Sequence, residues 1–289
     1  MCLIIIAHRM SPDYPLVLAA NRDEFFARPT RQAHDWAHEC AHESGQESDG
    51  AAIIAGRDLQ AGGTWLAVGR DGRFAAVTNV REAGGNGAGR RSRGELPVDF
   101  LASPLSPAEY LAQRSGGFAD YAGFNLLLGD VDSVCYASNR APGTYSVGAE
   151  IIGLANGAPG SNWPKVARGR EKMARLLAAG ARVKTAPLLA MMRDGRQAGQ
   201  ARLPRTGLPD EQERRLSPMF IPAQAGGYGT RCISVFIRDG DGRCHFTEQN
   251  FALDGQASGR HDFDFSIRQP PVSDGKRPAT DRSHAPPRI

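Results

Sequence analysis

The sequence predicts an α+β protein built from two antiparallel sheets with helices outside them. Short β-rich runs separated by turn residues occur in pairs near both ends of the chain, and helical patterns occupy the stretches between them. This β–α–β grouping is typical of sheets that carry helices on their outer faces. The 289 residues are 41% hydrophobic and 23% charged, which provides enough apolar surface for a folded core.

The first elements are four strands that form two hairpins. Residues 2–7 and 15–20 are apolar runs separated by a polar turn. Residues 64–69 and 73–80 are joined by an Asp-Gly pair at 71–72, which is a strong signal for a tight turn. We therefore expect the strands of each pair to lie antiparallel.

Helical and strand patterns alternate in the middle of the chain. Residues 84–94 are rich in glycine and predict a mobile loop that can cover a site. Helical patterns follow at 95–102 and 108–114. Three β-rich runs between residues 124 and 156 have a spacing typical of an antiparallel meander.

The clearest helix covers residues 163–179, because a proline lies in its first turn and a glycine follows its end. Two less regular helices are expected at 186–193 and 209–216. A last hairpin follows at 232–249, with a Gly-Asp-Gly turn between its strands.

From residue 254 onward the chain is rich in Pro, Ser, Asp and Arg and contains few aliphatic residues. Such a segment buries too little apolar surface to offset its ordering entropy. We therefore predict one domain at 1–253 and a disordered tail at 254–289.

Charge and hydropathy argue against several classes of function. Lys plus Arg total 35 and Asp plus Glu total 31, and a net charge of +4 is too dilute to indicate a nucleic-acid partner. No apolar run approaches the length of a membrane-spanning helix. The five cysteines form no CxxC pair, which argues against a disulfide framework or a structural zinc site and favours a reducing, cytoplasmic location. We expect no cofactor and no metal.

Cys2 is the first candidate for chemistry. Removal of Met1 would leave a thiol and a free α-amine on one residue. Their reference pKa values of about 8.5 and about 7.7–8.0 allow the amine to accept the thiol proton at little cost. This pattern is typical of an N-terminal nucleophile. The alternative is that Cys2 is a small apolar residue at the start of a buried strand.

Polar residues cluster where the second strand ends, in the run Asn21-Arg22-Asp23-Glu24. If the first hairpin is antiparallel, this run lies beside Cys2. A carboxylate there can hold an ammonium group, and an arginine can stabilise a thiolate or an acidic group of a substrate. The alternative is a solvated turn with a surface ion pair.

A series of sequence blocks extends from residue 1 to about residue 250. The blocks are an initial MC, LAANRDEFFARPT, GRDLQAGGTWLAV, RFAAVTNVR, LANGAPGSNWPK and YGTRCISV. This series resembles the NRDE protein family, also called the transport and Golgi organisation protein two family. The resemblance implies an αββα sandwich related to the N-terminal nucleophile hydrolases, with a layout similar to the choloylglycine hydrolases and penicillin V acylases. It also implies that Cys2 is the nucleophile.

The same resemblance implies further site residues. Asp23 matches the aspartate that contacts the N-terminal amine of those hydrolases. Asn79 and Asn156 match their two oxyanion-hole asparagines, and Arg231 matches a site arginine.

Four more residues in these blocks are expected to bind substrate: Asn21, Arg22, Trp65 and Arg81. The sequence departs from the hydrolases in one place, because their RNxD arginine corresponds to Ala20 here and the nearby arginine is Arg22. The charge of Arg22 is therefore expected to approach the site from a different position.

The activity that the resemblance implies is acyl transfer through Cys2, ending in hydrolysis of a non-peptide amide or ester. The substrate would be a small-molecule amide, an ester or an acyl lipid. The alternative is a non-catalytic carrier on the same fold, because eukaryotic members of the family are linked to membrane trafficking and to lipid and haem handling.

His34, His38 and His42 are spaced by four residues and would share one face of a helix. Three such imidazoles can bind a metal ion or haem iron. Their polar flanks and the lack of apolar periodicity favour a surface stretch instead. We interpret the arginine cluster at 90–93 in the same way, as a solvated loop.

Overall fold

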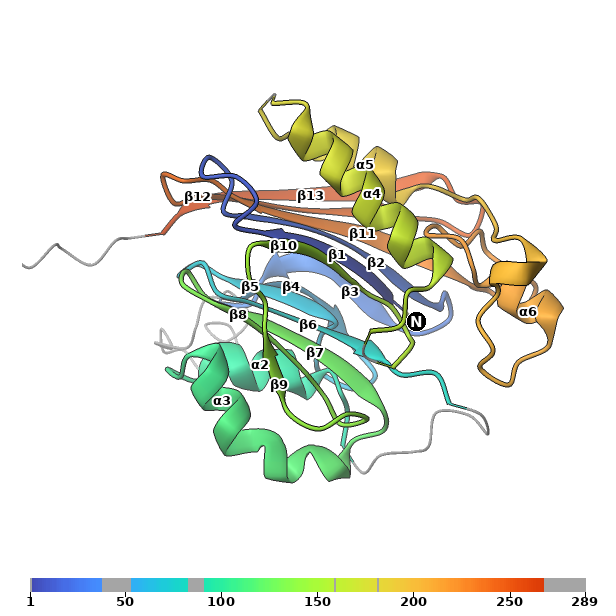
Figure 1. Cartoon of the computed structure of the whole chain (residues 1–289), viewed down its shortest axis with the longest axis horizontal. Coiled ribbons are helices and arrows are strands. Elements are labelled where there is room, and N and C mark those ends of the chain that lie inside the picture. The colour runs from blue at the N-terminus through green and yellow to red at the C-terminus, as the bar shows by residue number, and fades with distance from the viewer. Residues whose placement is uncertain (1, 38–52, 83–90, 159, 181, 268–289) are drawn as a thin grey trace, which may run out of the picture.

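Two antiparallel sheets stack face to face in the computed structural model of the chain, and helices cover the outer face of each sheet (Figure 1). The structure describes residues 2–37, 53–82, 91–158, 160–180 and 182–267. The layers follow the order helix, sheet, sheet, helix, so the predicted αββα sandwich is confirmed.

The first sheet contains the N-terminal strand, and its order is β10-β1-β2-β11-β12-β13. The strands are β1 (Cys2–His8), β2 (Leu16–Phe25), β10 (Glu150–Leu154), β11 (Tyr228–Arg238), β12 (Arg243–Phe251) and β13 (Ala257–Ser266). Antiparallel pairing of β1 with β2 and of β11 with β12 confirms the first and last predicted hairpins.

The second sheet follows sequence order from β3 to β9. Its strands are β3 (Thr30–Asp35), β4 (Ile53–Asp58), β5 (Leu66–Gly69), β6 (Phe74–Asn79), β7 (Phe124–Gly129), β8 (Val134–Ser138) and β9 (Thr144–Ser146). The predicted Asp-Gly hairpin is β5–β6. Gly72 in its turn has φ 84°, a backbone conformation that glycine adopts without a steric penalty.

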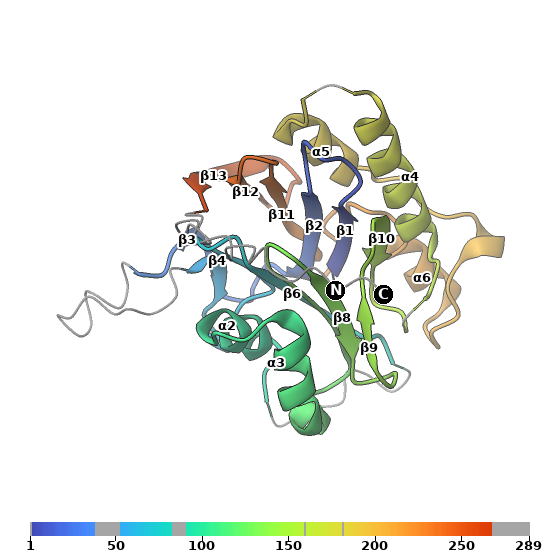
Figure 2. The same ribbon diagram turned by 60° about the vertical axis from the view of Figure 1, so that its left-hand side comes forward.

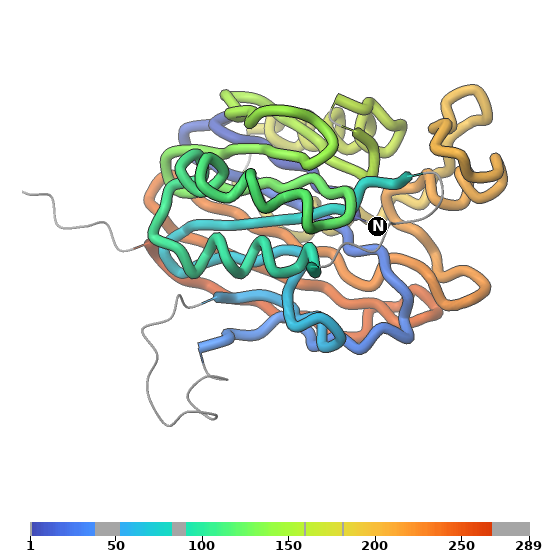
Figure 3. Tube along the Cα trace, turned by 90° about the horizontal axis from the view of Figure 1, so that it is seen from below, coloured from blue at the N-terminus to red at the C-terminus, as the bar shows by residue number. Residues whose placement is uncertain are grey.

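The helices of the outer layers belong to different parts of the chain. Helices α4 (Pro164–Ala178) and α5 (Thr185–Met192) pack on the first sheet. Helices α2 (Glu95–Ala102) and α3 (Pro107–Arg114) pack on the second sheet, and Figure 3 shows them from their outer side. The short helices are α6 (Asp210–Arg215), η1 (Ser115–Asp120) and η2 (Gln200–Arg202). No helix of the described residues is long and apolar enough to cross a membrane.

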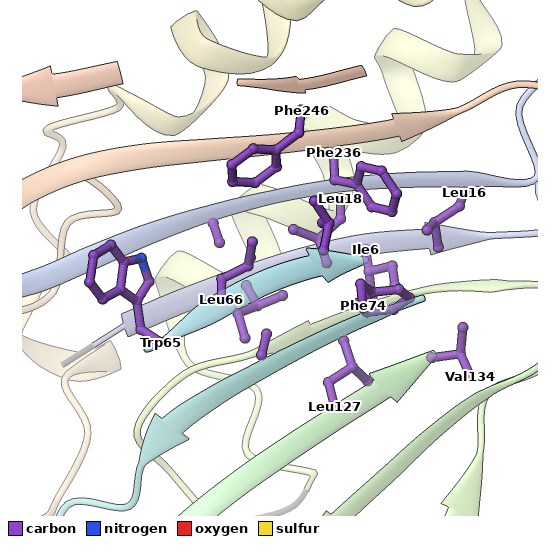
Figure 4. Close-up of a cluster of buried hydrophobic side chains, with 14 of the residues drawn as sticks. Ile6, Leu16, Leu18, Trp65, Leu66, Phe74, Leu127, Val134, Phe236 and Phe246 are labelled. Atoms are coloured by element: carbon purple, nitrogen blue, oxygen red, sulfur yellow. The ribbon is translucent and has the colours of Figure 1, made fainter. Parts of the chain in front are cut away.

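Alternate residues of the central strands face different layers. On β1, Ile4 and Ile6 pack between the sheets, whereas Leu3 and Ile5 pack against α4 and α5. Figure 4 shows the core between the sheets, to which β11 contributes Phe236. Because a strand has a period of two, neighbouring polar residues at its end also face opposite layers.

Five strands differ from the sequence prediction, namely β3, β4, β9, β10 and β13. Strand β10 does not continue the expected meander of β7 and β8, because it pairs with β1 in the other sheet, with Leu154 opposite Ile4. Strands β3 and β4 were not predicted. Polar residues dominate β3, and β4 contains only a short apolar run, so neither has the alternation that identifies a half-buried strand.

Strand β13 corrects the prediction of a tail that begins at residue 254. It pairs antiparallel with β12 along its length, and its Phe263 and Phe265 pack against the core between the sheets. The backbone hydrogen bonds and these two aromatic contacts supply the stabilisation that composition did not reveal. Residues 268–289 lie outside the described residues, so only their disorder stays a prediction.

Candidate active site

A polar cavity of about 330 Å³ lies at the end of the sandwich where β1 begins and β6 ends. Figure 2 marks this end by the label N. The cavity brings together five of the predicted site residues: Cys2, Arg22, Asp23, Trp65 and Asn79. It is lined from both sheets and from the segment that precedes α2.

Cys2 is the first residue of β1, and its position in the strand directs it to the space between the sheets. The strand register pairs Cys2 with Arg22, which confirms the prediction that the polar run lies beside it. Cys2 is a free cysteine. Burial raises the pKa of its thiol, the Asp23 carboxylate raises this pKa further, and Arg22 lowers it. The thiol therefore needs a proton acceptor to act as a nucleophile near neutral pH.

Asp23 is held in place by β11. The Thr230 hydroxyl donates a hydrogen bond of 2.6 Å to Asp23 Oδ1, and only 1% of Asp23 is exposed. Burial raises the pKa of the Asp23 carboxyl, and the nearby Lys165 lowers it. A carboxylate fixed beside Cys2 can orient an amine on that residue.

Asn79 and Asn156 form an amide pair at the wall of the cavity. Asn156 Nδ2 donates to the Asn79 side-chain oxygen Oδ1 at 2.9 Å and to the Asn79 backbone oxygen at 3.1 Å. Asn79 lines the cavity, whereas Asn156 is fully buried outside its lining. The arrangement gives Asn79 access to a ligand and leaves Asn156 to orient it, which differs from the implied pair of direct oxyanion donors.

Arg22 lies over the ring of Trp65, with 4.0 Å between the guanidinium carbon and the ring centroid. Its Nη1 donates to Thr30 Oγ1 at 2.8 Å, and its Nη2 lies 3.8 Å from Asp58 Oδ2. Stacking and charge pairing together fix this cation at the cavity. The positive charge of Arg22 therefore lies at the cavity, although Ala20 occupies the position that carries arginine in the hydrolases.

Asn21 does not line the cavity, although we expected it to bind substrate. It faces the helix layer, where its Nδ2 donates to the carbonyl oxygens of Met192 at 3.0 Å and Met219 at 2.7 Å. The reason is the period of the strand, which turns neighbouring side chains of β2 to opposite sides. Asn21 therefore ties α5 and the segment before β11 to the sheet.

Arg231 is also placed away from the cavity. A bulge in β11 between Thr230 and Cys232 leaves it without a partner residue on β2. Its Nη1 donates to the Phe25 carbonyl at 3.2 Å and to Thr30 Oγ1 at 3.1 Å. This arrangement fits a role in fixing the turn after β2 rather than the implied catalytic role.

Arg81 follows β6 but lies outside the cavity lining, so substrate contact there is not what the structure provides. Its Nη1 is 2.5 Å from Glu213 Oε2 in α6, and its guanidinium carbon is 4.9 Å from the centroid of the Trp163 ring. The Arg81–Glu213 pair is buried and joins β6 to α6.

Two residues that sequence analysis did not select lie near Cys2. Arg93 lines the cavity, and its Nη1 donates to the Gly123 carbonyl at 3.0 Å, which corrects the interpretation of this position as a solvated loop. Arg91 also lines the cavity, and this exposed residue pairs with Glu95. The remaining residues of the expected loop, 83–90, lie outside the described residues.

Lys165 is the second of these residues. It lies in the first turn of α4 and is 1% exposed. The signal that identifies it is its spacing of four from Gly169 and of eight from Met173, which places all three on the buried face of the helix.

His34 belongs to β3, so the helical spacing proposed for the three histidines does not apply to it. Its Nδ1 forms a hydrogen bond with the Gln32 carbonyl at 2.8 Å. His38 and His42 lie outside the described residues. Within the described ranges, no three His, Cys, Asp or Glu side chains converge as a metal site.

A larger and more apolar cavity, of about 450 Å³, runs along the free edges of β9 and β10. Tyr136, Ile152 and Leu154 contribute to its lining, with Glu150 and Arg170 as its charged residues. It contains none of the predicted site residues.

The two stacked sheets, the outer helices and the polar cavity at Cys2 define an αββα protein with a candidate thiol site. The family model described as Transport and Golgi organisation 2 matches residues 1–252. The chain therefore belongs to this family, as the sequence blocks indicated.

The chain is similar to curated members of the family from animals. It is 30% identical over 275 residues to the Transport and Golgi organization protein 2 homologs of Bos taurus and Homo sapiens, with 86% of this chain and 93% of each relative covered. It is 29% identical over 268 residues to Transport and Golgi organization protein 2 of Drosophila melanogaster, with 86% and 92% covered.

Solved structures with a detectable likeness include two amide hydrolases. The Caenorhabditis elegans ortholog of N-acylethanolamine-hydrolyzing acid amidase has 12% identity and a TM-score of 0.42, covering 75% of this chain and 98% of that one. The C2A mutant of conjugated bile acid hydrolase from Clostridium perfringens has 9% identity and a TM-score of 0.41, covering 92% and 98%.

Proposed function

We propose that this protein is a cysteine N-terminal nucleophile hydrolase that cleaves a non-peptide amide or ester by acyl transfer through Cys2. The observation that carries the proposal is that Cys2 lines a polar cavity together with Asp23 and Asn79. A thiol used only for packing would be enclosed by aliphatic side chains instead. The substrate is a small-molecule amide, ester or acyl lipid.

The first half of the reaction forms a thioester. Once Met1 is removed, the α-amine of Cys2 takes the proton of its own thiol, and Asp23 orients the resulting ammonium group. The thiolate attacks the carbonyl carbon, and Asn79 donates to the oxygen that becomes negative. When the carbon–nitrogen or carbon–oxygen bond breaks, the ammonium returns its proton to the leaving group.

The second half regenerates the enzyme. The amine, now neutral, takes a proton from water, and the hydroxide adds to the thioester carbonyl. Collapse of this intermediate breaks the carbon–sulfur bond and releases the acid, and the thiolate is protonated again. We place the reaction in a reducing compartment such as the cytoplasm, because an accessible thiol stays reduced there.

The test is capture of the acyl group on Cys2. Protein whose intact mass shows loss of Met1 is treated with an electrophilic acyl ester, and peptide mass mapping locates the adduct. We expect one fast thioester adduct at Cys2, none in Cys2→Ala, and an unchanged rate in the control Cys135→Ala, whose cysteine is buried in β8.

A retained Met1 or a fast adduct at another cysteine contradicts the proposal. So does release of acid from an amide and ester panel at the same rate in wild type and Cys2→Ala.

The apolar cavity along β9 and β10 favours a second candidate function, that of a carrier for an acyl lipid or haem. Its volume of about 450 Å³ lies in the range of small-molecule sites, and it is separate from Cys2. A carrier would bind one lipid or haem per chain in a titration, with the same affinity in Cys2→Ala. Loss of binding in Cys2→Ala would instead assign the ligand to the hydrolase site.

A further inference from the structure

Lys165 is the most unusual charged group of the described residues. Its side chain is 1% exposed, and its Nζ has neither a hydrogen-bond partner nor an ion-pair partner there. This Nζ lies 6.0 Å from the centroid of the Trp163 ring. Lysine is rarely buried without a partner, because an uncompensated charge in the interior is strongly destabilising. We therefore expect either that a nearby negative charge compensates the Lys165 ammonium or that the residue has a function.

Four groups act electrostatically on Lys165: Asp23, Arg81, Cys2 and Glu213. Arg81 and Glu213 form a close ion pair with each other, so their charges largely cancel. Asp23 and Cys2 are the groups that remain to balance the lysine. Helix α4, which carries Lys165, packs directly on β1, which carries Cys2.

Transfer of the thiol proton to the α-amine leaves the total charge of this cluster unchanged, because it creates a thiolate and an ammonium together. The positions of the fixed charges therefore decide how easily the thiolate forms. A protonated lysine near Cys2 favours the thiolate, which is the form that attacks a carbonyl.

We propose that protonated Lys165 is a positioning residue that acts on Asp23 and Cys2 to stabilise the ionised nucleophile. The inference rests on the proposed function, and it adds a residue of helix α4 to a site otherwise built from the two sheets and the segment before α2. Asp23 links the two, because it is the carboxylate beside Cys2 and its strongest opposing charge is Lys165.

The directions of the pKa shifts agree with this arrangement. Burial lowers the pKa of Lys165, and Asp23 is the main group that raises it. Burial raises the pKa of Asp23, and Lys165 is the main group that lowers it. Each group thus stabilises the charged form of the other.

Other charged or titratable groups also act electrostatically on Cys2. They are Arg22 and Asp23 on β2, Tyr228 and Cys232 on β11, and Arg93 before α2. A test of Lys165 must therefore change this residue alone and must report on Cys2 itself. Alkylation of Cys2 by iodoacetamide meets both needs, because its rate follows the thiolate fraction.

The experiment uses the full chain with Met1 removed and measures the rate of Cys2 alkylation across a pH series. In Lys165→Met we expect the midpoint of the profile to move to higher pH and the rate at pH 7 to fall about tenfold or more, as for loss of a close opposite charge. Lys165→Arg keeps a charge that does not titrate and should retain a midpoint near that of wild type. Lys184→Met removes an exposed lysine before α5 and is the matched control.

A midpoint in folded Lys165→Met that equals the wild-type midpoint, or lies below it, overturns the inference. Methionine is expected to fold, because it fills similar space without a buried charge. If it does not fold, Lys165→Gln replaces it and is judged by the same midpoint. A wild-type protein whose Cys2 reacts no faster than its buried cysteines contradicts the proposed function itself, so the two failures are distinct.

Discussion

Asn79→Ala lowers kcat/KM for hydrolysis of an amide or ester about 100- to 1,000-fold, which is the usual effect of removing one preorganised oxyanion donor. Asn79 ends β6 at the wall of the Cys2 cavity, and Asn156 Nδ2 donates one hydrogen bond to its side-chain oxygen and one to its backbone oxygen. A donor that is oriented before the substrate binds does not have to reorganise as charge develops. The rate of acid release with wild type and variant measures this loss.

Asn156, which donates hydrogen bonds to Asn79, allows a graded comparison. Asn156→Ala keeps the donor at the cavity but removes the contacts that orient it, so we expect a smaller loss of kcat/KM than in Asn79→Ala. Asn162→Ala, at an exposed asparagine before α4, is the control and should retain wild-type activity. A loss in Asn79→Ala of less than about threefold, against the range expected for a donor, would remove this residue from the oxyanion site.

Local patterns were sufficient to predict the pairing that builds the site. An apolar run, a polar turn and a second apolar run predict a hairpin, and an antiparallel hairpin places its last residues beside its first. This reasoning predicts that Asn21, Arg22 or Asp23 lies near Cys2, and the strand register pairs Arg22 with Cys2. The family resemblance added Asp23 and Asn79, both of which line the cavity.

The predicted site residues Asn21 and Arg231 lie away from the cavity, because the face of an element decides where a side chain points. Asn21 is adjacent to Arg22 in sequence, yet it points into the helix layer because strand side chains alternate. Arg231 is displaced by a bulge, which inserts one residue that no spacing rule anticipates. Motif matching identifies such residues but does not assign them to a face.

Sequence analysis missed Lys165 and Arg93 for a different reason, which is that tertiary packing buries these charged residues. A lysine in the first turn of a helix is normally solvated, and only the packing of α4 on β1 buries Lys165. Arg93 belongs to a glycine-rich stretch whose composition indicates a loop, but the loop end folds against the cavity. Strand β13 is a similar case. The composition of this segment indicates a tail, but its pairing with β12 stabilises it as a strand.

Glu213→Ala lowers the free energy of unfolding by about 3–5 kcal/mol, because it removes the carboxylate that compensates a buried guanidinium. The side chains of Arg81 and Glu213 are only 7% and 1% exposed, and their charged atoms lie 2.5 Å apart. Glu213 Oε1 also accepts hydrogen bonds from the backbone N–H and the hydroxyl of Thr206, so the substitution releases the segment before α6 as well. Urea denaturation followed by circular dichroism measures the change.

The same helix offers a matched control. Glu211 pairs with Arg215 on the exposed side of α6, at 3.0 Å, and Glu211→Ala should change stability by less than about 0.5 kcal/mol, because water screens an exposed pair. Glu213→Gln keeps a hydrogen-bonding side chain of the same size and should fall between the two. Equal losses of stability in Glu213→Ala and Glu211→Ala would mean that water solvates the charge of Arg81 once the carboxylate is removed. Because Arg81 follows Asn79 by two residues, a destabilised pair should also lower the rate of acylation at Cys2.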